Sequence, residues 1–132
     1  MKENKIVYRC ALVSAVLLMI ASLYHGVSVN NIVIAASTGD ISKHYATSVL
    51  IDGILSAMLL LLIAIWILFL SGDLKKGKRK AWWQAVLIGF AISTFGGALW
   101  FRYPTSIHLP AFLLMGLILL LPLIFYGRNF RQ

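Results

Sequence analysis

Long apolar runs alternate with short polar breaks along the chain, and the longest run covers residues 49–70. Every residue of this run is apolar or small, apart from Asp52 and Ser56. A helix needs about 20 residues to cross the hydrocarbon core of a bilayer, so the run predicts a membrane-spanning helix over about 46–70. Gly72 lies just beyond it and is expected to end the helix.

Three further apolar runs predict three further spanning helices, over about 6–26, 81–101 and 108–126. The first run follows a short charged segment, as in a signal peptide, but no A-x-A cleavage motif comes after it, so we expect a retained helix. Pro110 lies in the first turn of the fourth helix, where proline is tolerated, and Pro122 is expected to kink that helix. The third helix carries aromatic residues at both ends, as is usual at membrane interfaces: Trp82, Trp83, Trp100 and Tyr103.

The connection over 27–45 is the longest between the predicted helices. A single helix from Ile6 to Ala36 would have 31 residues, more than an ordinary span requires. We therefore expect an outer loop here, or a short interfacial helix packed on the mouth of the bundle. Asp40 and Ser42 are both placed to cap the start of the second helix.

Composition agrees with a membrane protein. The chain has 132 residues, of which 61% are hydrophobic and 12% charged, whereas a soluble domain has about 25% charged residues. The surplus apolar surface must face lipid, so we expect an all-α integral membrane protein with one four-helix membrane domain over 1–132. Cys10 is the only cysteine, which excludes an intrachain disulfide, a CxxC redox pair and a cysteine zinc cluster.

Positive charge is distributed unevenly between the two sides of the predicted bundle. With both termini inside, the cytoplasmic side holds ten of the twelve Lys and Arg residues, five of them in a loop over 71–80. The outer side holds only Lys43 and Arg102. This bias predicts a multi-pass protein of the plasma (inner) membrane with both termini cytoplasmic. Topology and attraction to anionic lipid headgroups explain the net charge of +8, so we expect membrane lipids and no nucleic acid as partners.

Polar residues gather at the outer ends of the predicted helices. Four of them recur at intervals of four in the second helix and therefore share one face: His44, Ser48, Asp52 and Ser56. A charge at the bilayer centre costs about 2.5–3.5 kcal/mol on insertion scales, so an acid in a membrane segment indicates a functional site. The ends of the other helices add polar groups at the same level. The predicted ligand-binding pocket comprises Asp52, His44, Arg102, His108, His25, Tyr24 and Ser48.

Several ligands suit these side chains. His25, His44 and His108 are of the type that binds zinc or copper, and two histidines at matching depth would suit a haem. The whole set would also bind the headgroup of a lipid, a quinone or another amphiphile. The structural alternative is an ion pair between Asp52 and Arg102 that holds the second and third helices together.

We interpret the chain as a binding protein rather than an enzyme. It would hold an amphiphile or a metal at the extracytoplasmic end of the bundle, alone or as an accessory subunit of a larger membrane complex. Two alternatives stay open: a dimeric, proton-coupled small-molecule transporter with Asp52 as the titrating group, and a lipid-modifying enzyme with His–Asp chemistry. Small residues at intervals of four predict close packing of the third helix, within the chain or in a homodimer: Ala85, Gly89, Ser93 and Gly97.

Overall fold

The computed structural model describes residues 2–39, 42–104 and 108–130, and they confirm the all-α prediction. The described residues contain four α-helices and one 3₁₀ turn and no strand. The elements are α1 (Lys2–Thr38), α2 (Lys43–Lys75), α3 (Arg79–Arg102), α4 (His108–Phe125) and η1 (Gly127–Asn129).

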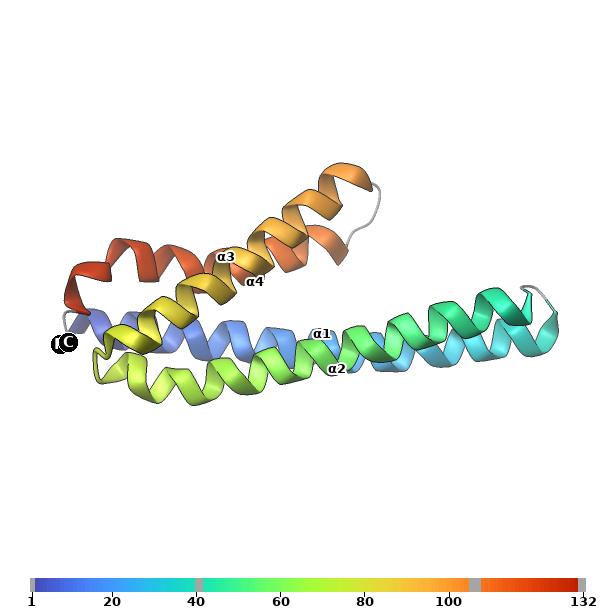
Figure 1. Ribbon diagram of the computed structural model, residues 1–132, viewed down its shortest axis with the longest axis horizontal. Helices are drawn as coiled ribbons and strands as arrows, with labels where there is room; N and C mark the ends of the chain where they lie inside the picture. Colours follow the sequence, from blue (N-terminus) through green and yellow to red (C-terminus); the bar gives the residue numbers. More distant parts are fainter. Residues whose placement is uncertain (1, 40–41, 105–107, 131–132) are drawn as a thin grey trace.

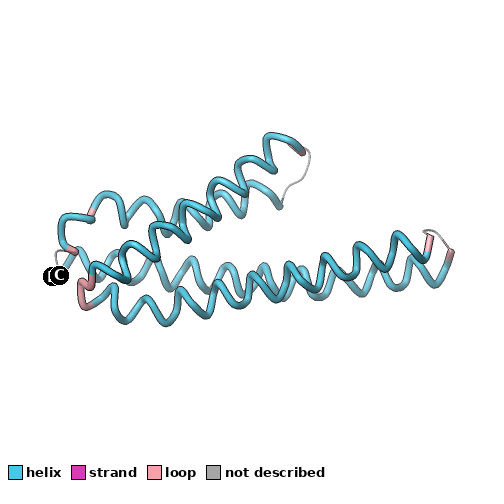
Figure 2. The backbone as a smooth tube through the Cα atoms, in the orientation of Figure 1, coloured by secondary structure: helices cyan, strands magenta, loops and turns pink. Residues whose placement is uncertain are grey.

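The helices pack as two antiparallel hairpins, α1 with α2 and α3 with α4 (Figure 1). The start of α1, the α2–α3 turn and η1 lie together at one end of the molecule, here named the terminal end. The two hairpins pack against each other near this end and diverge toward the opposite, distal end (Figure 2). The protein is therefore a pair of hairpins that are joined toward the terminal end.

The hydrophobic core occupies the terminal half, where all four helices meet. Its largest fully buried side chains are aliphatic: Leu18, Ile67, Leu74, Leu119 and Leu123. A buried hydroxyl adds a polar link between the hairpins, because Ser14 Oγ donates to the carbonyl oxygen of Met115 at 3.0 Å. In a bilayer such a core is stabilised by close packing rather than by the exclusion of water.

Glycines bring α3 and α4 into backbone contact. A Cβ on Gly89 would lie 3.1 Å from the Cβ of Leu120, and one on Gly96 would lie 2.6 Å from the backbone nitrogen of Leu113. Gly97, by contrast, has only an ordinary 3.6 Å contact. The small-residue face predicted on the third helix is thus used within the chain: Ser93 lies against Gly116, and Gly96 rather than Gly97 makes the close approach to Leu113.

α1 continues as one helix through the segment that was expected to be a loop. The prediction of a connection over 27–45 is wrong for residues 27–38, which are helical. This stretch contains no proline, and it packs on α2: Val29 is buried, and its Cγ2 lies 2.7 Å from the position that a Cβ on Gly53 would take. Because Gly53 has no side chain, Val29 fits against it, and α1 and α2 remain packed together beyond the span predicted for each helix.

α2 also extends beyond its expected bounds at both ends. Ser42 is its N-cap, accepting a hydrogen bond from the Tyr45 N–H at 3.3 Å, whereas Asp40 lies outside the described residues. The helix passes through Gly72 and ends at Lys75, so the C-cap expected at Gly72 is wrong. Gly77, with φ of +77°, makes the turn that follows. Most of the predicted loop over 71–80 is accordingly helical.

The two hairpins differ in length. At 1.5 Å per residue, α1 and α2 are about 55 and 50 Å long, whereas α3 and α4 are about 36 and 27 Å. Because the four helices are level at the terminal end, the α1–α2 hairpin projects beyond α3 and α4 at the distal end (Figure 1). Three helices, α1, α2 and α3, are long and apolar enough to cross a membrane, and α4 is shorter. These spans indicate a membrane protein.

Candidate functional site

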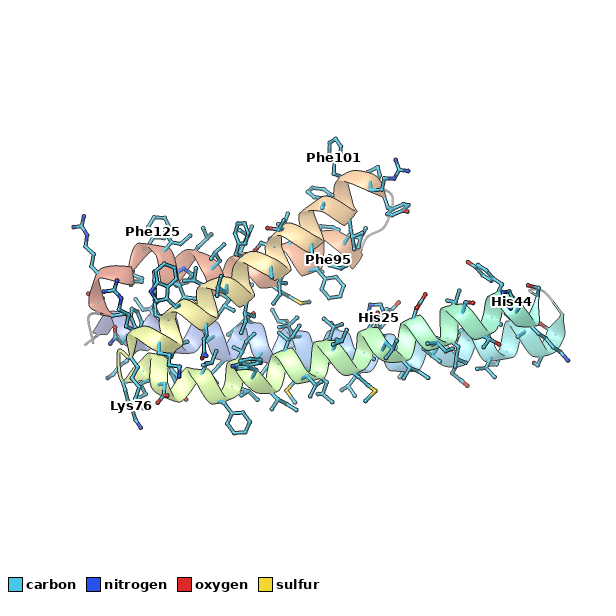
Figure 3. The ribbon with its side chains drawn as sticks, viewed as in Figure 1. His25, His44, Lys76, Phe95, Phe101 and Phe125 are labelled. Atoms are coloured by element: carbon cyan, nitrogen blue, oxygen red, sulfur yellow. The ribbon has the colours of Figure 1, made fainter. Side chains whose placement is uncertain are left out.

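The residues of the predicted pocket are spread along the distal half of both hairpins. His44 and Ser48 lie near the tip of the projecting hairpin, whereas His25 lies in the middle of α1 (Figure 3). The register of that hairpin is set by Ser22, whose Oγ donates to the carbonyl oxygen of Ala57 at 2.8 Å. His44 is therefore about 15 Å further along the hairpin than His25. The structure does not bring these two histidines together.

The polar stripe on α2 is exposed over its whole length. The interval of four predicted the shared face correctly, and all four members point away from α1: His44, Ser48, Asp52 and Ser56. Ser48 Oγ donates back to the carbonyl oxygen of His44 at 3.3 Å. Within the part of the chain that the structure describes, the Asp52 carboxylate has no ion-pair or hydrogen-bond partner.

Metal ligands do not converge in the described structure. Where side chains are described, no group of three or more His, Cys, Asp or Glu residues could hold a metal ion. The expected set of His25, His44 and His108 includes one residue, His108, whose side chain lies outside that description. The metal and haem hypotheses thus gain no support from the two histidines that are described.

Asp52 and Arg102 lie at the same level on the two helices that flank the α2–α3 turn. Asp52 is 23 residues before the end of α2, and Arg102 is 23 residues after the start of α3. Each is therefore about 35 Å from the turn along its own helix. Both side chains are exposed, and no salt bridge joins them. The ion pair expected between them is absent because the hairpins have diverged at this level.

Helical periodicity relates each of the two residues to neighbours on its own helix. Helical periodicity places Asp52 on the same face as Leu59 and Leu70, and Leu70 is buried in the core between the hairpins. It places Arg102 on the same face as Phe95, and Figure 3 shows Phe95 directed toward the α1–α2 hairpin. Leu59 and Phe95 are 59% and 67% exposed, so both side chains are largely uncovered by the rest of the described protein.

His25 marks the point at which the hairpins part. It is half-buried, and the centroid of its ring lies 6.1 Å from that of Phe112 on α4, at an interplanar angle of 40°. Among the described ring contacts and hydrogen bonds between the hairpins, this contact lies furthest toward the distal end. Tyr24, its neighbour in the chain, is exposed.

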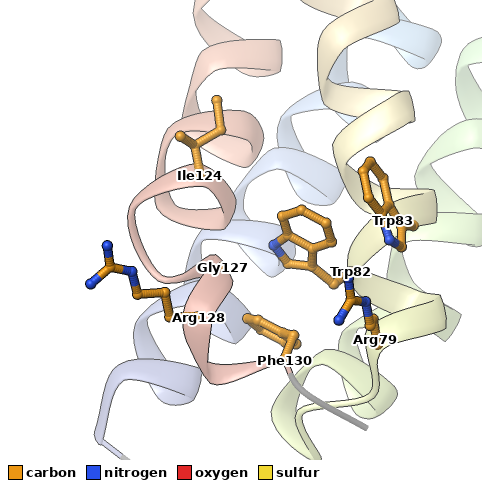
Figure 4. A pocket seen from close by; sticks show the side chains of 7 residues that line it. All are labelled: Arg79, Trp82, Trp83, Ile124, Gly127, Arg128 and Phe130. Carbon is orange, nitrogen blue, oxygen red and sulfur yellow. The ribbon is translucent and has the colours of Figure 1, made fainter.

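A pocket that the sequence did not predict lies at the terminal end (Figure 4). It has a volume of about 380 Å³ and is lined mostly by aromatic and basic residues: Arg79, Trp82, Trp83, Ile124, Gly127, Arg128 and Phe130. The sequence indicated the tryptophans as interface residues. It gave no sign that Phe130 folds back, yet that side chain is 2% exposed.

Trp82 holds the floor of this pocket in place. Its indole Nε1 donates to the carbonyl oxygen of Leu123 at 2.7 Å, which satisfies one of the carbonyls left open at the end of α4. The Trp82 ring stacks on Phe130 with centroids 6.5 Å apart and meets Trp83 edge-on at 4.7 Å. Gly127 leaves room for the same ring, since a Cβ there would lie 3.1 Å from it. The floor is therefore fixed by packing before any ligand arrives.

Comparison with known proteins finds no relative: no family model, no curated protein and no solved structure matches the chain. The fold and its spans define a small helical membrane protein.

Proposed function

We propose that this is a multi-pass protein of the plasma (inner) membrane, with four spans and both termini cytoplasmic, that binds an amphiphile between its two hairpins at the extracytoplasmic end. The distribution of basic residues supports this orientation. The described cations of the terminal end include Lys5, Arg9, Arg128 and those of the α2–α3 turn, whereas the distal half carries only Lys43 and Arg102. Cytoplasmic segments carry such an excess of Lys and Arg.

α3 supports a position for the bilayer. Its tryptophans, Trp82 and Trp83 at one end and Trp100 at the other, are about 27 Å apart along the helix, close to the thickness of a hydrocarbon core. The shorter α4 would span beside it with local thinning of the bilayer. On this placement Asp52 lies at the outer boundary, where a charged group costs little compared with the bilayer centre.

The divergence of the hairpins is the observation that carries the ligand proposal. Below the boundary, exposed Leu59 and Phe95 offer apolar contacts to an acyl chain. At the boundary, Asp52 and Arg102 stand level on the two hairpins, and neither charge has an ion-pair or hydrogen-bond partner among the described residues. A zwitterionic headgroup would pair with both charges, its phosphate with Arg102 and its ammonium with Asp52. We therefore favour a phospholipid that carries an amine over a neutral quinone.

Native mass spectrometry of the full chain in mild detergent tests this proposal, with phosphatidylethanolamine added as the probe. We expect a one-lipid adduct whose abundance falls roughly tenfold in Asp52→Asn and in Arg102→Gln, since each variant loses a charge-assisted contact. Lys43→Gln is the matched control, because it removes an outer cation that lies at the hairpin tip. An adduct that is equally abundant in all four proteins would overturn the proposal.

The other interpretations of the sequence stay predictions. A transporter needs a polar path to the cytoplasmic side, and the terminal half is filled instead by side chains such as Leu18, Ile67 and Leu119. A homodimer or a larger membrane complex would cover exposed apolar residues of the α1–α2 hairpin, for example Val27 and Phe69. The lipid-modifying enzyme would need a His–Asp pair, and the described histidines form no ion pair or hydrogen bond with Asp52.

A further inference from the structure

The pocket at the terminal end combines a rigid aromatic floor with positive charge. Arg79 of α3 and Arg128 of η1 stand on its two sides, and Phe130 and Trp82 lie between them (Figure 4). Arg79 is exposed and forms no hydrogen bond or ion pair with the described residues. This pocket is at the opposite end of the molecule from Asp52 and Arg102, so what it binds is independent of the function proposed above.

The surroundings of the pocket are strongly basic. Lys76, Lys78 and Lys80 lie within three residues of Arg79, whereas the described acid of this end, Asp73, is already paired with Lys78 at 2.8 Å. α3 also begins without a side-chain cap, so the N–H groups of its first turn add the positive end of the helix dipole beside Arg79. The local field therefore favours an anion.

The pocket is continuous with exposed apolar surface. Trp83 and Ile124 line it and are also among the exposed large apolar side chains of the protein. An anion that carries hydrocarbon chains would contact both kinds of wall, with its charge toward Arg79 and its chains along Trp83 and Ile124. A free inorganic anion would use only the first of these contacts.

We propose that this pocket binds the phosphate of an anionic phospholipid from the leaflet at the terminal end. The Arg79 guanidinium donates to the phosphate oxygens, for which its planar fork is well suited. Basic pockets between helices on the cytoplasmic side bind anionic headgroups in this way. Trp82 acts indirectly, by holding α4 and Phe130 in position through its bond to Leu123.

The test is a titration of the full chain in mild detergent, followed by native mass spectrometry, with three probes: short-chain phosphatidylglycerol, the matching phosphatidylcholine, and inorganic phosphate. We expect phosphatidylglycerol to bind at least about tenfold more tightly than either of the others, because only it offers both an uncompensated negative charge and acyl chains. Arg79→Gln should weaken its binding roughly tenfold, and Arg79→Lys should restore part of the loss.

Lys80→Gln is the matched control. Lys80 is the next residue after Arg79 and carries the same charge, but its side chain does not line the pocket. We expect less than about a twofold effect from it, as for a diffuse surface charge. Equal losses in Arg79→Gln and Lys80→Gln would overturn the proposal in favour of general attraction by the basic turn. Equal binding of phosphatidylcholine, or of inorganic phosphate, would overturn the anionic-lipid assignment itself.

A second variant keeps the test informative if Arg79→Gln does not yield folded protein. Trp83→Ala removes the lipid-facing wall and leaves the basic residues in place. It should weaken phosphatidylglycerol binding several-fold and leave the weak binding of inorganic phosphate unchanged. Unaltered binding of phosphatidylglycerol by this variant would contradict a lipid site at this position.

Discussion

Gly96 of α3 faces the backbone of Leu113 on α4 so closely that a Cβ on Gly96 would lie 2.6 Å from the Leu113 nitrogen. Real Cβ atoms do not approach that near, so any side chain at 96 must push the two helices apart. Gly89, two turns nearer the start of α3, makes a looser approach, because a Cβ there would lie 3.1 Å from the Cβ of Leu120. The α3–α4 hairpin is thus a tightly closed unit, although it is loosely attached to α1–α2 at its distal end.

Gly96→Ala is expected to destabilise the protein by about 1–3 kcal/mol, the usual cost of overpacking a close contact. Thermal or denaturant unfolding of the detergent-solubilised chain measures this effect. Gly97→Ala is the control, because a Cβ there meets only an ordinary 3.6 Å contact. Similar losses in the two variants would show that backbone approach at 96 is not the cause.

Trp82→Phe is expected to cost about 0.5–1.5 kcal/mol, because it keeps an aromatic ring but removes the hydrogen bond to the Leu123 carbonyl. The adjacent Trp83→Phe should change the free energy of unfolding by less than about 0.5 kcal/mol, as is usual for an exposed side chain. Circular dichroism melts of both variants decide the matter. A smaller effect at 82 than at 83 would argue against the structural role of the indole N–H.

Gly77→Ala should destabilise the α2–α3 turn by about 1–2 kcal/mol, because Gly77 has a φ of +77° that disfavours any residue with a Cβ. The added Cβ would also come within 3.1 Å of Asn4 Nδ2. Gly72→Ala is the opposite case: it lies within α2 with nothing near its Cβ, so it should stabilise by about 0.5–1 kcal/mol. The same unfolding experiment compares the two variants. A change in the free energy of unfolding of the same sign in both would contradict the turn assignment.

Asp52 and Arg102 should show almost no energetic coupling in the ligand-free protein. Since both are exposed and neither is paired with a described residue, Asp52→Asn and Arg102→Gln should each shift the free energy of unfolding by less than about 0.5 kcal/mol, and the double variant should equal their sum. A coupling energy above about 1 kcal/mol in this double-mutant cycle would indicate a direct ion pair. That result would favour the structural interpretation over a ligand between the hairpins.

The sequence predicted the helices better than their ends. The apolar runs located all four helices, and of the two caps predicted for α2, Asp40 and Ser42, the structure has Ser42 as the N-cap. The loop over 27–45 was inferred from span length alone, which assumes that an apolar helix stops where the bilayer does. Helices α1 and α2 instead continue because Val29 packs over Gly53, a contact between residues 24 positions apart that no local pattern reveals.

In the candidate site, too, features set by local helix geometry were predicted, and features set by the packing of the hairpins were not. The interval of four placed His44 and Asp52 on one face, and counting from the α2–α3 turn puts Asp52 level with Arg102. Which way that face points depends on how the hairpins pack, so the exposure of the stripe was not predictable. The terminal pocket was missed because it needs Phe130 to fold back onto Trp82, and a single aromatic residue after a helix carries no signal for that.

The pairing of sequence neighbours also has a consequence for biogenesis. Each hairpin contains its own closest contacts, so α1 and α2 can associate in the membrane while α3 is still being synthesised. The second hairpin can close in the same way around Gly96 and Gly116. Only the shared core of the terminal half requires both hairpins to have formed, and Phe130 is the last of its residues to be synthesised. Assembly of this protein then needs one docking step between two finished halves, with no helix threaded between others.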